Sequence, residues 1–185
     1  IVAIFLGQEN HREANRAYTQ NLVVLGGISL VIMAAVWLSL DRIAAFLGAT
    51  AATMEYVKHY ILSILPFAWC FIISYSFEIL VKTDGYPRFA TMAVTAGALL
   101  NCVLDYLFVM VFKWEVAGAG AATGISQMVT VFLYLKHFLS PRATIRFEKP
   151  RWSGAQFWRV IKIGLSSGLT ELSAGFTVFM FNHAI

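Results

Sequence analysis

The chain has 185 residues, of which 59% are hydrophobic and 13% carry charge, and its mean hydropathy is +0.70. About a quarter of the residues of a soluble globular domain are charged, so this composition excludes an ordinary soluble protein. The net charge is +4, but the basic residues cluster in particular loops, which indicates membrane topology and not nucleic-acid binding. The two cysteines, Cys70 and Cys102, share no metal-ligand spacing and are expected to be buried thiols.

The predicted elements begin with residues 1–6, which are expected to be the end of a helix that starts before the given sequence. Five apolar stretches follow, and each can cross a hydrocarbon core of about 30 Å, which takes about 20 helical residues. They cover residues 21–40, 58–81, 89–112, 116–135 and 160–185. The sequence therefore predicts an all-α, polytopic transmembrane helix bundle. Its apolar ends and the absence of an initiator Met favour an internal piece of a longer protein.

Polar or mixed connectors separate the spans at residues 7–20, 43–57, 82–88 and 136–159. Within the second span, Pro66 is expected to kink the helix, because proline removes a backbone donor. In the last connector, Ser153 and Gln156 have the spacing of a capping box, which predicts that a helix begins there.

Lys and Arg are distributed unevenly between the two sets of connectors. One side of the membrane holds eleven, namely Arg12, Arg16, Lys82, Arg88, Lys136, Arg142, Arg146, Lys149, Arg151, Arg159 and Lys162. The other side holds three, namely Arg42, Lys58 and Lys113. Cytoplasmic loops carry the excess of Lys and Arg. The connectors at 7–20, 82–88 and 136–159 are therefore predicted to be cytoplasmic, in a multi-pass protein of the plasma (inner) membrane.

Three polar residues of the third and fourth spans are predicted to meet. Asn101 and Asp105 are four residues apart on one helix face, and Asp105 lies about 10 Å from the outer end of its span. Thr123 lies about as deep in the fourth span, and a short turn makes these two spans antiparallel neighbours. A carboxylate, an amide carbonyl and a hydroxyl suit a hard cation, and a desolvated carboxylate can also hold a proton. The set is either a Na⁺ or H⁺ site or a hydrogen-bond network that only packs the bundle.

Two glutamates also fall within the spans. Glu78 lies one helical turn before Lys82, so an interfacial i,i+4 ion pair explains it. Glu171 lies near the middle of the fifth span, where it is either a proton or cationic-substrate site or the acceptor of structural hydrogen bonds. The expected donors to Glu171 are Ser167, Thr170 and Ser173.

Other small and polar residues favour packing roles. In the fourth span, Gly120 and Gly124 form a GxxxG pair, which favours close contact between helices. The histidines show no ligand spacing and are expected at the membrane interface; they are His11, His59, His137 and His183. The sequence contains no visible set of paired histidines with carboxylates, and no nucleophile with a base, so an enzyme is not expected.

Short motifs along nearly the whole chain resemble those of the multidrug and toxin extrusion (MATE) family. The segment Asn101-Cys-Val-Leu-Asp105 resembles the N-x-x-x-D of the family's helix five, and residues 118–127 resemble a small-residue motif of its helix six. The turn at residues 83–88 resembles the one before the family's helix five. Further matches are Gly7 with Ala14, Leu47-Gly48-Ala49, Tyr60 and Pro66-Phe67.

The resemblance implies a fold of twelve helices in two six-helix lobes. Residues 1–140 would then hold most of the first lobe, residues 141–159 the cytoplasmic inter-lobe connector, and residues 160–185 the start of helix seven. The resemblance also implies that Asn101, Asp105 and Thr123 form the first-lobe cation site, with an Asp of helix one that this sequence lacks. Glu171 is a candidate for a functional Glu of helix seven, although it comes about one turn earlier than in other members.

The predicted function is a secondary-active antiporter that exports organic cationic or amphipathic compounds, driven by a Na⁺ or H⁺ gradient. The expected partners are drug-like small molecules and the lipid bilayer, with no nucleic acid. No cofactor is expected, and no metal beyond the coupling cation, in a protein that works as a monomer when full length. The alternatives are a flippase for lipid-linked precursors, for which the spans lack buried Arg or Lys, and a non-transporting membrane subunit.

Overall fold

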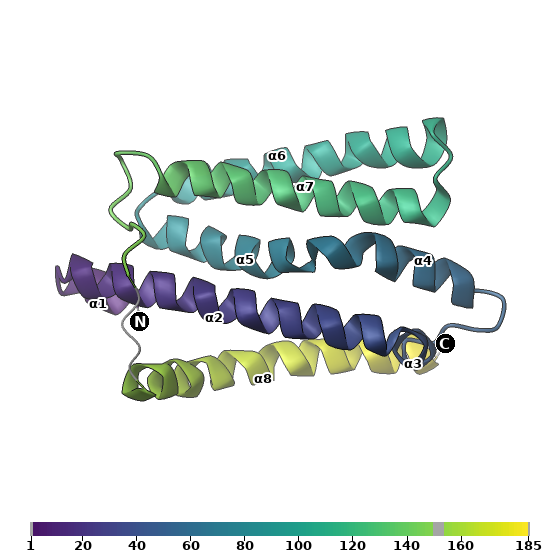
Figure 1. Cartoon of the computed structure of the whole chain (residues 1–185), viewed down its shortest axis with the longest axis horizontal. Coiled ribbons are helices and arrows are strands. Elements are labelled where there is room, and N and C mark those ends of the chain that lie inside the picture. The colour runs from purple at the N-terminus through teal and green to yellow at the C-terminus, as the bar shows by residue number, and fades with distance from the viewer. Residues whose placement is uncertain (1, 150–153, 185) are drawn as a thin grey trace.

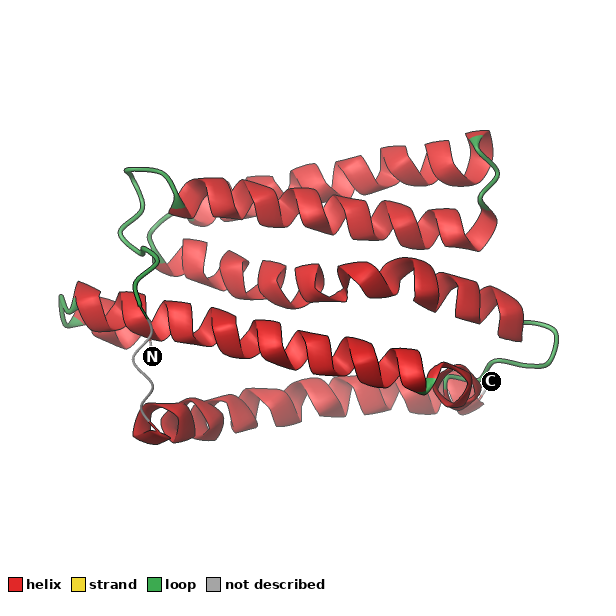
Figure 2. Cartoon of the chain, viewed as in Figure 1, coloured by secondary structure: helices red, strands yellow, loops and turns green. Residues whose placement is uncertain are grey.

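A computed structural model describes residues 2–149 and 154–184. Every regular element in this part of the chain is helical, which confirms the predicted all-α fold (Figure 2). The elements are α1 Val2–Gly7, α2 His11–Leu38, α3 Leu40–Phe46, α4 Met54–Ile64, η1 Leu65–Phe67, α5 Ala68–Thr83, α6 Pro87–Asp105, η2 Tyr106–Val111, α7 Glu115–Phe138 and α8 Gly154–Ala184. The short element η1 is a 3-10 helix and η2 is a π-helix.

The long helices lie roughly along one axis and form a bundle (Figure 1). In this bundle α7 packs against α6, α4 and α5, while α2 packs against α5. Figure 1 shows α6 and α7 at one side and α8 at the opposite side, beyond α2. Near its end α8 meets α3, where the rings of Phe46 and Phe179 stack with their centroids 4.9 Å apart.

Four helical segments are long and apolar enough to cross a membrane: His11–Leu38, Met54–Thr83, Pro87–Val111 and Glu115–Phe138. They coincide with the first four predicted spans to within two residues at the outer ends of the first and third, which confirms a multi-pass arrangement. The fifth predicted span lies in α8, where the described apolar segment is the shorter Gly168–Phe181. That span stays a prediction.

The connector predicted at residues 7–20 is wrong in its extent, because α2 already begins at His11. The side chain of Asn10 accepts a hydrogen bond from the backbone N–H of Glu13 at 3.2 Å and caps the new helix. Ala14 and Tyr18 are fully buried on this first part of α2. Burial against the bundle therefore extends the helix through sequence that is polar enough to resemble a loop.

The predicted interruption at Pro66 is confirmed, since the 3-10 turn η1 separates α4 from α5 within one span. The GxxxG prediction is confirmed as well. A Cβ atom placed on Gly120 would overlap Ser63, and one placed on Gly124 would overlap the ring of Phe67. The missing side chains thus let α7 approach the α4–η1 segment closely.

An aromatic core lies where α2, α5 and α7 meet. The rings of Tyr18 and Phe138 have centroids 5.1 Å apart, and Phe77 lies at the same centroid distance from Phe138. Cys70 belongs to this buried cluster, as predicted. The same prediction is wrong for Cys102, which is exposed on α6, because a residue next to Asn101 in a helix points about 100° away from it.

The capping box predicted at Ser153 and Gln156 falls partly outside the described residues, because Ser153 is not among them. The helix that it was expected to start is present as α8, which begins at Gly154.

Candidate cation site and cavity

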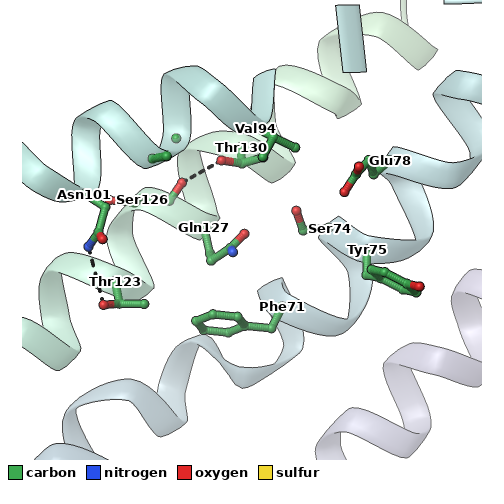
Figure 3. Close-up of a pocket in the computed structure, with 12 residues that line it drawn as sticks. Phe71, Ser74, Tyr75, Glu78, Val94, Asn101, Thr123, Ser126, Gln127 and Thr130 are labelled. Atoms are coloured by element: carbon green, nitrogen blue, oxygen red, sulfur yellow. Dashed lines mark hydrogen bonds between the residues drawn. The ribbon is translucent and has the colours of Figure 1, made fainter. Parts of the chain in front are cut away.

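Asn101 and Thr123 meet across the interface between α6 and α7. The side-chain amide Nδ2 of Asn101 donates to Oγ1 of Thr123 at 3.4 Å (Figure 3). The Thr123 hydroxyl donates in turn to the carbonyl of Ala119 at 2.9 Å, one turn earlier in α7. The short turn between the two helices makes them antiparallel neighbours, so the predicted meeting of these two residues is confirmed.

Asp105 is the last residue of α6, one turn after Asn101, and the π-helix η2 follows it directly. Its side chain is half-buried, and Oδ1 is buried without a hydrogen-bond partner among the described residues. Leaving a charged acceptor buried and unpaired costs at least about 1–3 kcal/mol. A proton or a cation would remove that cost.

The structure does not join Asp105 directly to the other two residues of the predicted set. The cavity beside Asn101 and Thr123 is not lined by Asp105. The three residues therefore lie on neighbouring helical turns, with Asp105 at the far end of the group from the cavity.

The cavity has a volume of about 420 Å³ and lies between α5, α6 and α7. Its size falls within the range of about 300–1,000 Å³ that small-molecule sites occupy. The lining residues are Phe71, Ser74, Tyr75, Glu78, Val94, Gly97, Ala98, Asn101, Thr123, Ser126, Gln127 and Thr130. In Figure 3, Asn101 and Thr123 lie at one end, Glu78 lies at the other, and Gln127 lies between them.

Most hydroxyl groups of the α7 wall already donate to the backbone of their own helix. Ser126 donates to the carbonyl of Ala122 at 2.8 Å, and Thr130 donates to the carbonyl of Ser126 at 2.9 Å. Gln127 differs, because its side-chain oxygen is buried and accepts no hydrogen bond from any described residue.

Glu78 forms the predicted ion pair with Lys82, whose Nζ lies 2.6 Å from Oε1. The prediction was incomplete, since Glu78 also lines the cavity. Its helical neighbours Phe71 and Ser74 line it too, at the i, i+3 and i+7 spacing of one helix face. That spacing is visible in the sequence and could have identified the cavity-facing side of α5.

Glu171 lies on α8, exposed to the surroundings and away from the cavity. The expected bond from Ser173 is wrong, because the Ser173 hydroxyl donates to the carbonyl of Leu169 at 2.9 Å. This i−4 bond is the usual choice for a serine within an apolar helix. The side chain of Ser167 lies outside the described residues. The structure therefore does not bring Glu171 into the set formed by Asn101 and Thr123.

A second buried polar cluster lies at the opposite end of the bundle, at the turn between α5 and α6. His137 Nε2 lies 2.9 Å from Asp84 Oδ2, and the Asp84 side chain is 0% exposed. The backbone N–H groups of Thr144 and Ile145 also donate to Asp84, each at 3.1 Å. His137 lies in the last turn of α7, at the end of its span, and the segment after α7 folds back and buries it. Its position at the membrane interface stays a prediction.

The same segment is tied to the beginning of α2. The backbone N–H of Arg146 donates to the Asn15 side chain at 2.9 Å, and that of Glu148 donates to the Thr19 hydroxyl at 3.0 Å. The Glu148 carboxylate also pairs with Arg12 at 3.2 Å. Residues 139–149 thus join the end of α7, the α5–α6 turn and α2.

Comparison with known proteins agrees with this fold. The sequence model of the family MatE matches residues 1–107. The multidrug export protein MepA of Staphylococcus aureus (strain bovine RF122 / ET3-1) is 25% identical over 98% of this chain, which spans 41% of that relative. MepA of Staphylococcus saprophyticus is 23% identical over 89% of the chain and 38% of the relative. A solved inward-facing MATE family transporter of the MOP superfamily superposes with a TM-score of 0.90 at 21% identity, over 96% of this chain and 41% of its own.

Proposed function

The chain belongs to the MatE family, and from this premise we propose that it forms most of the first lobe of a secondary-active antiporter. The transporter exports organic cationic or amphipathic compounds across the plasma (inner) membrane, driven by a Na⁺ or H⁺ gradient. It works as a monomer, with the connectors at 82–88 and 136–159 facing the cytoplasm. The description of two relatives as multidrug export proteins supports the substrate class.

One observation carries the proposal: the buried, unpartnered Oδ1 of Asp105 one turn beyond the Asn101–Thr123 contact. A hard cation bound in this position would give the orphaned oxygen a partner, and a carboxyl group is also able to carry a proton. The helix changes from α to π geometry directly after Asp105, where η2 begins. Short π-helical segments often occur at functional sites. Ion binding at Asp105 then favours one lobe arrangement and release of the substrate.

The cavity supports a cationic substrate over an anionic one. Its lining includes the carboxylate of Glu78 and no Lys or Arg. A flippase for lipid-linked precursors would need basic groups in the cavity to hold an anionic headgroup, so the described lining disfavours that alternative.

The driving force is sufficient for export. One charge that crosses a potential of 100 mV supplies about 2.3 kcal/mol. By the rule of tenfold per 1.4 kcal/mol, that free energy supports about 50-fold accumulation against a gradient.

The proposal is tested with Asp105→Asn in the full-length transporter. We expect loss of ion-coupled drug efflux with normal expression, because the amide cannot take up a proton or balance a cation. Drug accumulation in cells, measured with and without a Na⁺ gradient and across a pH gradient, reports the coupling ion.

The matched control is Asp41→Asn, which removes the charge of an aspartate that is 78% exposed and pairs with Lys58. This variant should export like the wild type. Unchanged efflux in Asp105→Asn would refute the coupling role of Asp105.

A further inference from the structure

The end of the cavity that faces away from Asn101 and Thr123 contains the carboxylate of Glu78, which can only accept hydrogen bonds when it is ionised. Glu78 and Ser74 face the cavity from α5, and Gln127 lies on α7 between Glu78 and the Asn101–Thr123 contact (Figure 3). The oxygen of Gln127 is buried without a partner among the described residues. The occupant that suits this end is therefore a group that donates hydrogen bonds and carries positive charge.

Glu78 already has a cationic partner, but that partner comes from outside the cavity. Lys82 Nζ lies 2.6 Å from Glu78 Oε1, yet Lys82 does not line the cavity. Its side chain is 46% exposed, and it lies in the last turn of α5. A long, exposed lysine can leave the carboxylate at low cost, because an exposed ion pair contributes little net free energy.

We propose that Glu78 is the residue that selects positively charged substrates, and that Lys82 competes for it until the substrate arrives. A substrate ammonium or similar cationic group displaces Lys82 from the Glu78 carboxylate and donates a hydrogen bond to the Gln127 oxygen. The ring of Phe71 lines the same cavity and offers an aromatic face to an organic cation. This inference rests on the proposed function and adds a substrate-reading site to it.

In this proposal the coupling ion and the substrate bind to two different carboxylates. Asp105, at the end of α6, takes the coupling ion, whereas Glu78, on α5, takes the charge of the substrate. The exchange at Glu78 keeps that end of the cavity neutral in both states, because one cation replaces another. The site therefore holds a cationic substrate without a second uncompensated buried charge.

The experiment compares one variant of each partner of the ion pair. If the pair were only structural, both variants would change ethidium binding in the same direction. Binding of the cation ethidium and of an uncharged hydrophobic dye is titrated on the purified full-length transporter. In Glu78→Gln, ethidium affinity should fall about tenfold, the worth of one charge-assisted hydrogen bond. In Lys82→Gln, ethidium affinity should rise about threefold, because the competitor is gone. The uncharged dye should bind both variants like the wild type.

Two further variants keep the test decisive. Glu55→Gln removes a carboxylate that pairs with Lys58 outside the cavity, and it should leave ethidium binding unchanged. If Glu78→Gln does not fold, Gln127→Leu replaces it and should also weaken ethidium binding selectively.

The inference is overturned if Glu78→Gln binds ethidium like the wild type, or if Lys82→Gln and Glu78→Gln both weaken it. Either result leaves the antiporter proposal intact when the wild type still exports drugs. A wild type that exports nothing under either ion gradient refutes the antiporter proposal instead. The binding titration still tests whether Glu78 selects cationic compounds.

Discussion

His137 Nε2 lies 2.9 Å from Asp84 Oδ2, and this pair joins the last turn of α7 to the turn that follows α5. Two backbone N–H groups of the returning segment, those of Thr144 and Ile145, complete the hydrogen bonds of the carboxylate. The rings of Tyr86 and Phe89 lie against His137, with centroids at 4.7 Å and 5.4 Å. A single buried carboxylate thus organises one end of the bundle.

Asp84→Asn should lower the free energy of unfolding by about 1–3 kcal/mol, because the amide loses one acceptor and places N–H groups against backbone N–H donors. The measurement is thermal unfolding of the purified full-length protein in detergent. Glu148→Gln is the comparison, since Glu148 pairs with the exposed Arg12 and with Arg16 in partly exposed ion pairs, whose loss we expect to cost about 1 kcal/mol. Equal effects of the two substitutions would show that burial of Asp84 does not matter.

Gly124→Val should destabilise the protein by about 1–3 kcal/mol, because overpacking forces a shift between α7 and the ring of Phe67. The control is Gly27→Ala in α2, where a Cβ meets nothing within 4 Å. That substitution should be neutral or stabilise by about 0.5–1 kcal/mol through the higher helix propensity of alanine. Melting temperatures of the two variants measure the contrast, and a stable Gly124→Val would argue against close α7–η1 packing.

Thr123→Val keeps the shape of the side chain and removes the hydroxyl that Asn101 contacts. We expect the ion concentration at half-maximal transport to rise by about two- to tenfold, the worth of one hydrogen bond, with little change in stability. Transport is measured across a series of Na⁺ concentrations and pH values. Thr95→Val is the matched control, because Thr95 donates only to the carbonyl of Thr91 on an exposed face of α6. An identical ion dependence in both variants would remove Thr123 from the site.

The part of the site that depends on helix periodicity could be predicted from the sequence. Asp105 and Thr123 are predicted at matching depths in two spans joined by a short turn, and Asn101 lies on the same helix face one turn deeper. The rise per residue therefore predicts the neighbourhood of the three residues, but not that Asn101 is the one in contact with Thr123. The position of Glu78 at the cavity was not predicted, because an i,i+4 ion pair with Lys82 already explained why a glutamate lies near the end of that span. Knowing that α7 covers this face of α5 requires the tertiary packing.

The contact between Asp84 and His137 could not be predicted in the same way. The two residues are 53 positions apart, and neither lies in a periodic segment that points at the other. Their meeting depends on the path of residues 139–149, which carry no helical or strand pattern. The π-helix after Asp105 is equally hidden, because the segment Tyr106–Val111 is uniformly apolar and fits an ordinary α-helix equally well.

The tethering of residues 139–149 has a mechanical consequence for the two-lobed transporter proposed above. The backbone is anchored as far as Glu148, through Thr19 on α2, so this stretch is held to the helices of the bundle. In that transporter, a pivot between the lobes would come after this anchor. The length of chain that would couple the lobes in that transporter is therefore shorter than the 136–159 connector, and the hydrogen bond between Glu148 and Thr19 marks where it starts.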